Sequence, residues 1–191
     1  MTVAAADGRA IAAAASPEAA LIERARAMEP AAWDELYSMH YPAIHRYCAY
    51  RLARADTAED IAADVFLEAV RGIARYRYTG TPFRAWLYRI AHNLTADERR
   101  RRARDAVSAA ALPLETASDP DIAAGVVDRR AIEAALHALT EDQQQVIILR
   151  FFEGLPVRDV AAIIGKPEGA VKALQHRAMA RLRTLLEGEG R

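Results

Sequence analysis

The chain has 191 residues, with 26 basic and 26 acidic side chains and a single cysteine, Cys48. This length suits one medium-sized domain or two small ones, and one cysteine excludes an intrachain disulfide. No apolar run approaches the ~20 residues of a membrane span, and the alanine-rich start lacks the apolar core of a signal peptide. We therefore expect a cytoplasmic protein.

Alanine, leucine, arginine and glutamate dominate the composition, which favours an all-α fold. The net charge of zero hides a block pattern: residues 1–70 are net −5, 71–104 net +8, 105–143 net −6 and 144–191 net +3. With a Debye length of ~8 Å at physiological salt, such blocks stay electrostatically distinct. Two basic segments separated by an acidic one are compatible with a nucleic-acid binder.

The amino-terminal part predicts a tail and two helices. Residues 1–17 lack apolar periodicity and are expected to be mobile, and a helix is expected from Pro17–Glu18 until Pro30 interrupts it. A second helix starts at Ala31. Proline supplies no amide donor, so Pro42 is expected to kink or break this second helix.

The next helix, starting near Asp56 or Thr57, has a wide apolar arc and a charged outer face. The outer face carries an exposed leucine among charged residues: Asp60, Asp64, Leu67, Glu68 and Arg71. An apolar anchor with a charged rim is typical of a protein-docking surface. An ordinary solvated face is the alternative, since single exposed leucines are common.

A loop then leads into the most informative stretch of the chain, residues 82–104. In the loop, Tyr76 and Tyr78 alternate with Arg75 and Arg77, and aromatic rings interleaved with cations can stack an unpaired base and hold its phosphate. At helical spacing, residues 82–104 bury an apolar face formed by Phe83, Leu87, Ile90 and Leu94. One flank of that face carries Trp86, Arg89, Asn93, Asp97 and Arg100, and the stretch ends in a run of arginines. The pattern predicts a nucleic-acid surface, with a solvated basic helix as the alternative.

Residues 105–125 contain two prolines and acidic charge, and they are expected to form a linker. After it, Thr140 with Gln143 predicts a capping box, Gly154 a helix stop, and Pro156 the start of a short helix. The turn at residues 165–167 precedes a last long helix. Helix, tight glycine turn and helix together predict a helix-turn-helix.

The last helix divides into two sides. Its buried side contains Val171, Leu174, Ala178, Leu182 and Leu185. Its outer side contains Gly169, Lys172, Ala173, His176, Arg177 and Arg183. Small residues would let a groove wall approach, and the cations can donate to guanine edges or phosphates.

Three stretches together resemble a bacterial sigma factor: DIAADVFLEAVRGIARYR, PFRAWLYRIAHNLTADERRRR and LTEDQQQVIILRFFEGLPVRDVAAIIGKPEGAVKALQHRAMARLR. The chain is similar to the extracytoplasmic-function class of the sigma-70 family. The resemblance implies two helical domains: a region 2-like domain at residues 18–104, and a region 4-like domain at residues 126–187 joined to it by the flexible linker.

The resemblance also implies partners. The surface of residues 60–71 would dock on the β′ clamp helices of core RNA polymerase. The minus-ten element, melted to single strands, would be read by Tyr76, Arg77, Arg84, Trp86, Arg89, Asn93 and Arg100. The minus-thirty-five duplex would be read by Lys172, Ala173, His176, Arg177 and Arg183, with the preceding helix facing the β flap. An anti-sigma factor is implied by the family alone.

Two other classes of protein fit the sequence less well. A stand-alone helix-turn-helix regulator would need a dimer to read two half-sites, and it would leave the first basic segment unexplained. An enzyme is not expected, because no nucleophile–base pair, phosphate loop or cofactor site is evident. His40, His45 and Cys48 are close in sequence, but their spacing matches no closed zinc site, so no metal is expected.

Overall fold

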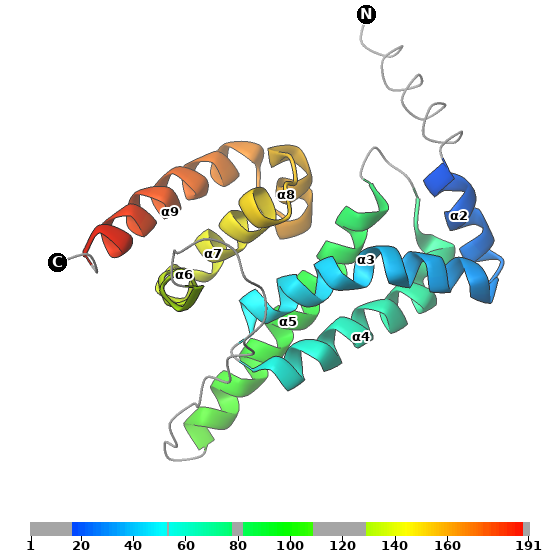
Figure 1. Cartoon of the computed structure of the whole chain (residues 1–191), viewed down its shortest axis with the longest axis horizontal. Coiled ribbons are helices and arrows are strands. Elements are labelled where there is room, and N and C mark those ends of the chain that lie inside the picture. Colours follow the sequence, from blue (N-terminus) through cyan, green and yellow to red (C-terminus); the bar gives the residue numbers. More distant parts are fainter. Residues whose placement is uncertain (1–16, 53, 78–81, 109–128, 189–191) are drawn as a thin grey trace, which may run out of the picture.

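The structure is a computed structural model, and it describes residues 17–52, 54–77, 82–108 and 129–188 (Figure 1). The first group of helices comprises α2 (Pro17–Arg26), α3 (Pro30–Arg51), α4 (Ala55–Gly72), the 3₁₀ turn η1 (Ile73–Arg75) and α5 (Phe83–Ser108). The described residues contain no strand, and this confirms the predicted all-α fold. Residues 1–16 and 109–128, which include most of the predicted tail and linker, lie outside the described residues.

Proline has different effects at two positions of α3. Pro30 occupies the first turn, where a missing amide costs nothing, so it starts the helix. Pro42 lies inside the helix, which continues unbroken to Arg51. Of the predicted kink or break at Pro42, the break does not occur. Packing of the flanking turns, with Leu36 and Ile44 both buried in the core, holds the helix together despite the lost backbone bond.

Helices α3, α4 and α5 pack side by side, and α2 lies across one end of α3 (Figure 1). The apolar arc of α4 faces inward, with Val65, Phe66 and Ala69 buried. On α5, Phe83 and Leu87 are buried, and the predicted inner face continues through the half-buried Ile90 and Leu94. This arrangement leaves the polar flank of α5 on the surface.

The second group comprises α6 (Arg129–His137), α7 (Glu141–Ile147), a π-helical segment η2 (Ile148–Phe152), α8 (Val157–Ile164) and α9 (Glu168–Gly188). The capping box at the start of α7 is present: Thr140 accepts from the Gln143 amide, and the Gln143 side chain accepts from the Thr140 amide. Gly165 ends α8 in the left-handed region, at φ 66°. Pro156 immediately precedes α8 as its N-cap, and the predicted helix-turn-helix is formed by α8 and α9.

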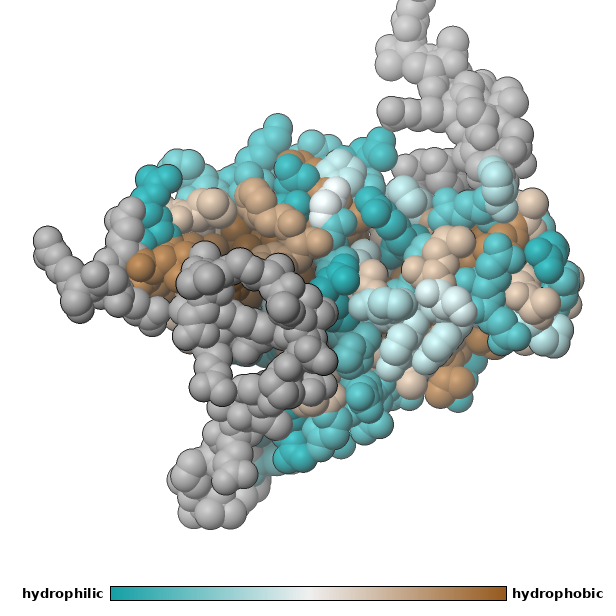
Figure 2. Space-filling view, in the orientation of Figure 1, coloured by the Kyte–Doolittle hydropathy of each residue, from teal (hydrophilic) through white to brown (hydrophobic). Residues whose placement is uncertain are grey.

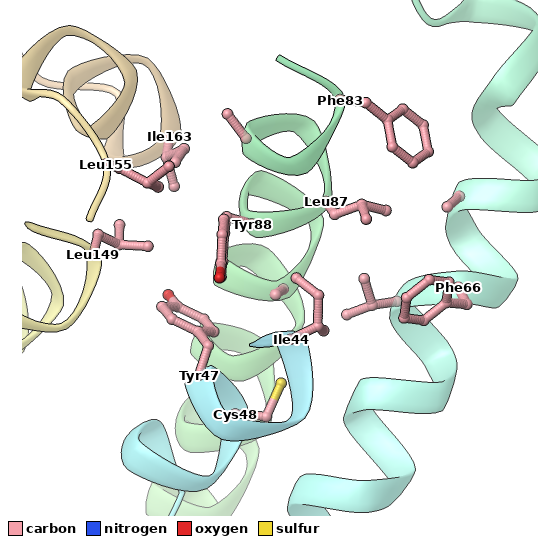
Figure 3. Close-up of a cluster of buried hydrophobic side chains, with 14 of the residues drawn as sticks. Ile44, Tyr47, Cys48, Phe66, Phe83, Leu87, Tyr88, Leu149, Leu155 and Ile163 are labelled. Carbon is pink, nitrogen blue, oxygen red and sulfur yellow. The ribbon is translucent and has the colours of Figure 1, made fainter. Parts of the chain in front are cut away.

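The two groups of helices share one hydrophobic core. Tyr47 and Tyr88 of the first group and Leu149, Leu155 and Ile163 of the second belong to a single cluster of buried side chains (Figure 3). Helix α8 packs against α5, and η2 against α3. The sequence predicts two domains, and the structure packs them against each other.

Candidate nucleic-acid interface

The outer face of α4 is exposed, as its pattern predicts. Leu67 is 53% exposed, and Asp60 and Asp64 are open to solvent on the same helix. Glu68 and Arg71 form an i,i+3 ion pair with a nitrogen-to-oxygen distance of 2.7 Å. Exposed ion pairs of this kind contribute little stability, so Glu68 and Arg71 can form ion pairs with a partner protein at little cost to the fold.

A second exposed group on the first helices was not predicted. Tyr37 of α3 is 41% exposed, stacks on Tyr41 with ring centroids 4.6 Å apart, and tilts against Phe66 of α4. The sequence analysis gave Tyr37 and Tyr41 no functional role. The sequence did contain a signal for this pair, because two aromatic residues four positions apart lie next to each other on the surface of a helix.

A cavity of about 370 Å³ opens between the end of α4 and the polar flank of α5. Its lining combines rings, cations and an amide: Glu68, Gly72, Arg75, Tyr76, Trp86, Arg89, Ile90, Asn93 and Leu94. Three residues of the predicted flank, Trp86, Arg89 and Asn93, thus come together with the end of α4. Gly72 permits this approach, because a Cβ at that position would lie 3.2 Å from the Trp86 ring.

Tyr76 occupies a different place from the one its pattern predicts. Its side chain is only 7% exposed and packs against Phe83 and Trp86, with ring centroids 5.4 and 5.0 Å away. The Arg26 guanidinium donates to the Tyr76 carbonyl from α2. Tyr76 therefore supports the cavity from within the core, and the prediction of an open stacking ring is wrong for it. Tyr78 lies outside the described residues.

The arginines at the end of α5 form more ion pairs within the protein than the sequence indicates. Glu98, a buried carboxylate, pairs with Arg101 at 2.7 Å and Arg102 at 2.6 Å. Burial opposes ionisation of Glu98, but the two guanidinium groups dominate and lower its pKa. Arg100 pairs with Asp97, and Arg99 turns towards α7. Arg84, Arg89 and Arg77 remain exposed near the start of α5.

Helix α9 shows the predicted division of sides. Val171 and Ala178 are fully buried and Leu174 is 9% exposed. The outer residues are exposed: Gly169, Lys172, Ala173, His176, Arg177 and Arg183. Within the described part of the chain, Lys172 and Arg177 form no ion pair, so their charges are available to a ligand. Apolar surface also gathers over this part of the molecule, where Met179 and Leu186 of α9 are exposed (Figure 2).

Polar contacts fix α8 and α9 on α7 and η2. Lys166 in the turn pairs with Asp142 at 2.9 Å, and Arg150 donates to Gln175 of α9 and to the Leu155 carbonyl. A cation at the turn thereby joins the start of α9 to the start of α7. This holds the outer side of α9 in one orientation.

Two family profiles match the chain: Sigma-70 region 2 over residues 36–105 and Sigma-70, region 4 over residues 135–184. The ECF RNA polymerase sigma factor SigD of Mycobacterium tuberculosis (strain ATCC 25618 / H37Rv) is 33% identical over 183 residues, covering 90% of this chain and 84% of that protein. The chain belongs to the sigma-70 family, in its ECF class. The resemblance seen in the sequence is confirmed. The region 2 match accounts for the first basic segment, which a stand-alone regulator leaves unexplained.

Other relatives of this sigma factor agree. The ECF RNA polymerase sigma factor BldN of Streptomyces coelicolor is 37% identical over 183 residues, and the chain spans 66% of its length. The sigma factor RpoE of Bartonella quintana, solved with the anti-sigma factor NepR, has a TM-score of 0.74 at 27% identity, covering 81% of this chain and 96% of that one. CnrH, solved with the cytosolic domain of CnrY, shares the fold, with a TM-score of 0.69 at 23% identity, covering 91% and 99%.

None of the helices in the described residues has the length and apolar character needed to cross a membrane. No three of their histidine, cysteine, aspartate and glutamate side chains are arranged to hold a metal ion.

Proposed function

We propose that this sigma factor binds core RNA polymerase in the cytoplasm, opens promoter DNA with the cavity between α4 and α5, and reads the upstream duplex with α9. The observation that carries the proposal is the cavity itself. It places the half-buried Trp86 ring beside the exposed Asn93 amide and the cation of Arg89. A ring, a hydrogen-bonding amide and a cation are the groups that hold an unpaired base and its phosphate.

The other two surfaces complete the assignment. The face of Asp60, Asp64, Leu67, Glu68 and Arg71 would dock on the β′ clamp helices. The outer side of α9 would enter the major groove at the minus-thirty-five element, with Lys172 and Arg177 near its amino end, and α8 would face the β flap. An anti-sigma factor is the regulator that the family implies. Catalysis then belongs to the polymerase, and this chain contributes recognition alone.

Run-off transcription with core polymerase, on promoter fragments from the source genome, tests the proposal as a whole. Asn93→Ala is expected to reduce strand opening, measured by permanganate reactivity, more than it reduces association with the duplex. Glu35→Ala, an exposed change on α3, is the matched control. Wild-type opening by Asn93→Ala would refute the role of Asn93. No promoter-specific transcript from the wild-type chain would refute the function.

Docking on the polymerase has its own test. Reversing charge in Asp60→Lys/Asp64→Lys is expected to weaken co-purification with core polymerase while circular dichroism shows unchanged helix content. Both side chains are exposed, so the fold does not depend on them. Unchanged co-purification would contradict the assignment of this face.

A further inference from the structure

Helix α2 contributes none of the side chains that line the cavity between α4 and α5, yet it packs on η1 beside that cavity. Three residues of α2 are buried: Leu21, Ile22 and Ala25. The Trp33 indole of α3 donates to the Ala25 carbonyl at 3.0 Å. Apolar packing and a hydrogen bond at its last turn therefore fix α2 on α3, so α2 can hold other segments in place.

Arg26, the last residue of α2, connects this helix to the segment that follows α4. Its guanidinium donates to the Tyr76 carbonyl, 50 residues further along the chain. It also pairs with Glu23, one turn earlier on α2, at 2.7 Å. The bond to Tyr76 is charge-assisted and partly buried, and such bonds are stronger than those between neutral groups. Arg26 thus ties the end of α2 to one backbone atom beside the cavity.

Tyr76 is the residue at which the chain leaves helical geometry. It follows η1 with an extended backbone, φ −60° and ψ 131°, and its amide donates to the Ile73 carbonyl at 3.1 Å. The Tyr76 carbonyl also accepts from Arg77 at 3.1 Å. Arg77 is exposed and is the next residue in the chain, so it moves with Tyr76. Arg26 belongs to another helix and can therefore hold Tyr76 in place.

The position of Tyr76 determines where the Trp86 ring can lie. The two rings have centroids 5.0 Å apart, and the Phe83 ring lies 5.4 Å from each of them. Gly72 is a further neighbour of Trp86, close enough that a Cβ would lie 3.2 Å from the ring. A site binds well only while its supporting residues keep the contacting groups within ~0.5 Å of their places. A shift of Tyr76 would therefore displace the ring that we expect to stack on an unpaired base.

The bonds of Arg26 contribute more to this geometry than to stability. Its Nε atom is buried and has no hydrogen-bond partner within the described part of the chain. A buried donor without a partner is destabilising, and an ion pair as exposed as the one with Glu23 contributes little. An apolar side chain of similar length would keep the packing of Arg26 and lose the bond to Tyr76.

We propose that Arg26 is a positioning residue for promoter opening: by holding the Tyr76 carbonyl, it fixes the Trp86 ring at the cavity between α4 and α5. The inference rests on the proposed function for the role of that cavity, whereas the contacts from Arg26 to Trp86 belong to the fold. The unit that opens DNA then includes α2, which precedes the part of the chain that matches Sigma-70 region 2.

Arg26→Met tests the proposal, because it keeps a long side chain and removes the donors. We expect its urea midpoint to stay near the wild-type value, since Arg77 still donates to the Tyr76 carbonyl. Holoenzyme binding to a forked promoter, whose minus-ten strand is already single, should weaken several-fold. Permanganate reactivity on the fully paired promoter should fall with it. Binding to a duplex that carries the minus-thirty-five element alone should not change, because α9 is proposed to read that element.

Other changes on α2 separate the bond to Tyr76 from the rest of the helix. Glu23→Ala removes the other partner of Arg26, and Arg24→Ala removes an exposed ion pair with Glu29. Both variants should bind the fork as the wild type does. Arg26→Lys retains a cationic donor, and it should bind the fork more tightly than Arg26→Met.

Several outcomes would overturn the proposal. They are wild-type fork binding by Arg26→Met, a large drop in its urea midpoint, and an equal loss on the fork and on the minus-thirty-five duplex. A loss of fork binding shared by Glu23→Ala and Arg24→Ala, or no gain in Arg26→Lys over Arg26→Met, would do the same. Equal binding of forked and fully paired minus-ten DNA by wild-type holoenzyme would instead count against the proposed function.

Discussion

Helices α5 and α9 both present a basic side, but they build it differently. On α5 the side chains proposed to hold an unpaired base are framed by other elements: Gly72 admits the Trp86 ring, and Tyr76 supports it from the core. On α9 the proposed contacts, Lys172 and Arg177, simply project from a helix. Stability and DNA recognition should therefore be coupled in the region 2-like domain and separable in the region 4-like domain.

The largest expected effect is a joint loss of stability and DNA recognition in the region 2-like domain. Tyr76→Ala empties a site that is 7% exposed, and loss of a buried aromatic side chain costs about 3 kcal/mol or more of unfolding free energy. Trp86 loses its support, so strand opening should fall together with stability. Urea unfolding and permanganate reactivity measure the two quantities. Tyr37→Ala, at a ring 41% exposed, should cost less stability. Equal losses in the two variants would contradict the supporting role of Tyr76.

The second effect should appear in recognition without a loss of stability. Arg177→Ala on α9 is expected to remove ~1–3 kcal/mol of preference at one base of the minus-thirty-five element. Arg183 lies further along the helix, where we expect it to contact a phosphate. Arg183→Ala should therefore weaken binding to all sequences alike and lower the slope of log affinity against log salt concentration by about 1. Holoenzyme binding to a promoter library at several salt concentrations separates the two. If Arg177→Ala keeps the full base preference and changes only the salt slope, Arg177 contacts a phosphate and not a base.

Local signals in the sequence predicted much of the region 4-like domain. The capping box of Thr140 and Gln143, the left-handed Gly165 and the two sides of α9 depend on neighbours in the chain, and all are present. The exposed face of α4 and the inner face of α5 were predictable for the same reason. Each follows from helical spacing alone.

Features that depend on distant contacts were missed. Tyr76 reads as a loop aromatic, and its burial follows from Phe83 and Trp86 packing over it. Gln144 and Gln145 are both buried, although helical periodicity gives no reason to place these polar residues in the core. Arg51 lies about 90 residues from its acceptors, so no local pattern links them. Domain packing was for that reason beyond what periodicity could predict.

The third effect is confined to the start of α7. Thr140→Ala removes the side chain that accepts the Gln143 amide, and such a loss typically costs ~1 kcal/mol. The neighbouring Glu141 pairs with Arg51 of α3 at 2.7 Å, so this contact between the two groups of helices should weaken slightly as well. Thr184→Ala, whose hydroxyl bonds only within α9, is the control on unfolding free energy. An unchanged midpoint in urea for Thr140→Ala would show that the cap contributes nothing.

The variant with the smallest expected change in stability gives the sharpest test of whether packing around Trp86 controls DNA recognition by α5. Gly72→Ala improves helix propensity by up to ~1 kcal/mol, but its methyl group would meet the Trp86 ring at 3.2 Å. The ring must shift by a few tenths of an ångström, and this changes the lining of the cavity. We therefore expect nearly unchanged unfolding free energy and a several-fold loss of strand opening, measured by permanganate reactivity.

Gly169→Ala on α9 is the matched glycine control for stability, because a Cβ there would meet nothing within 4 Å. It should gain stability without a steric cost. If Gly72→Ala gains as much stability as Gly169→Ala and opens promoters as the wild type does, the Trp86 ring is free to move and the shape of the cavity is not set by Gly72. If strand opening falls while stability holds, the contact between Gly72 and the Trp86 ring controls DNA recognition, whereas Arg177 is an exposed side chain on α9.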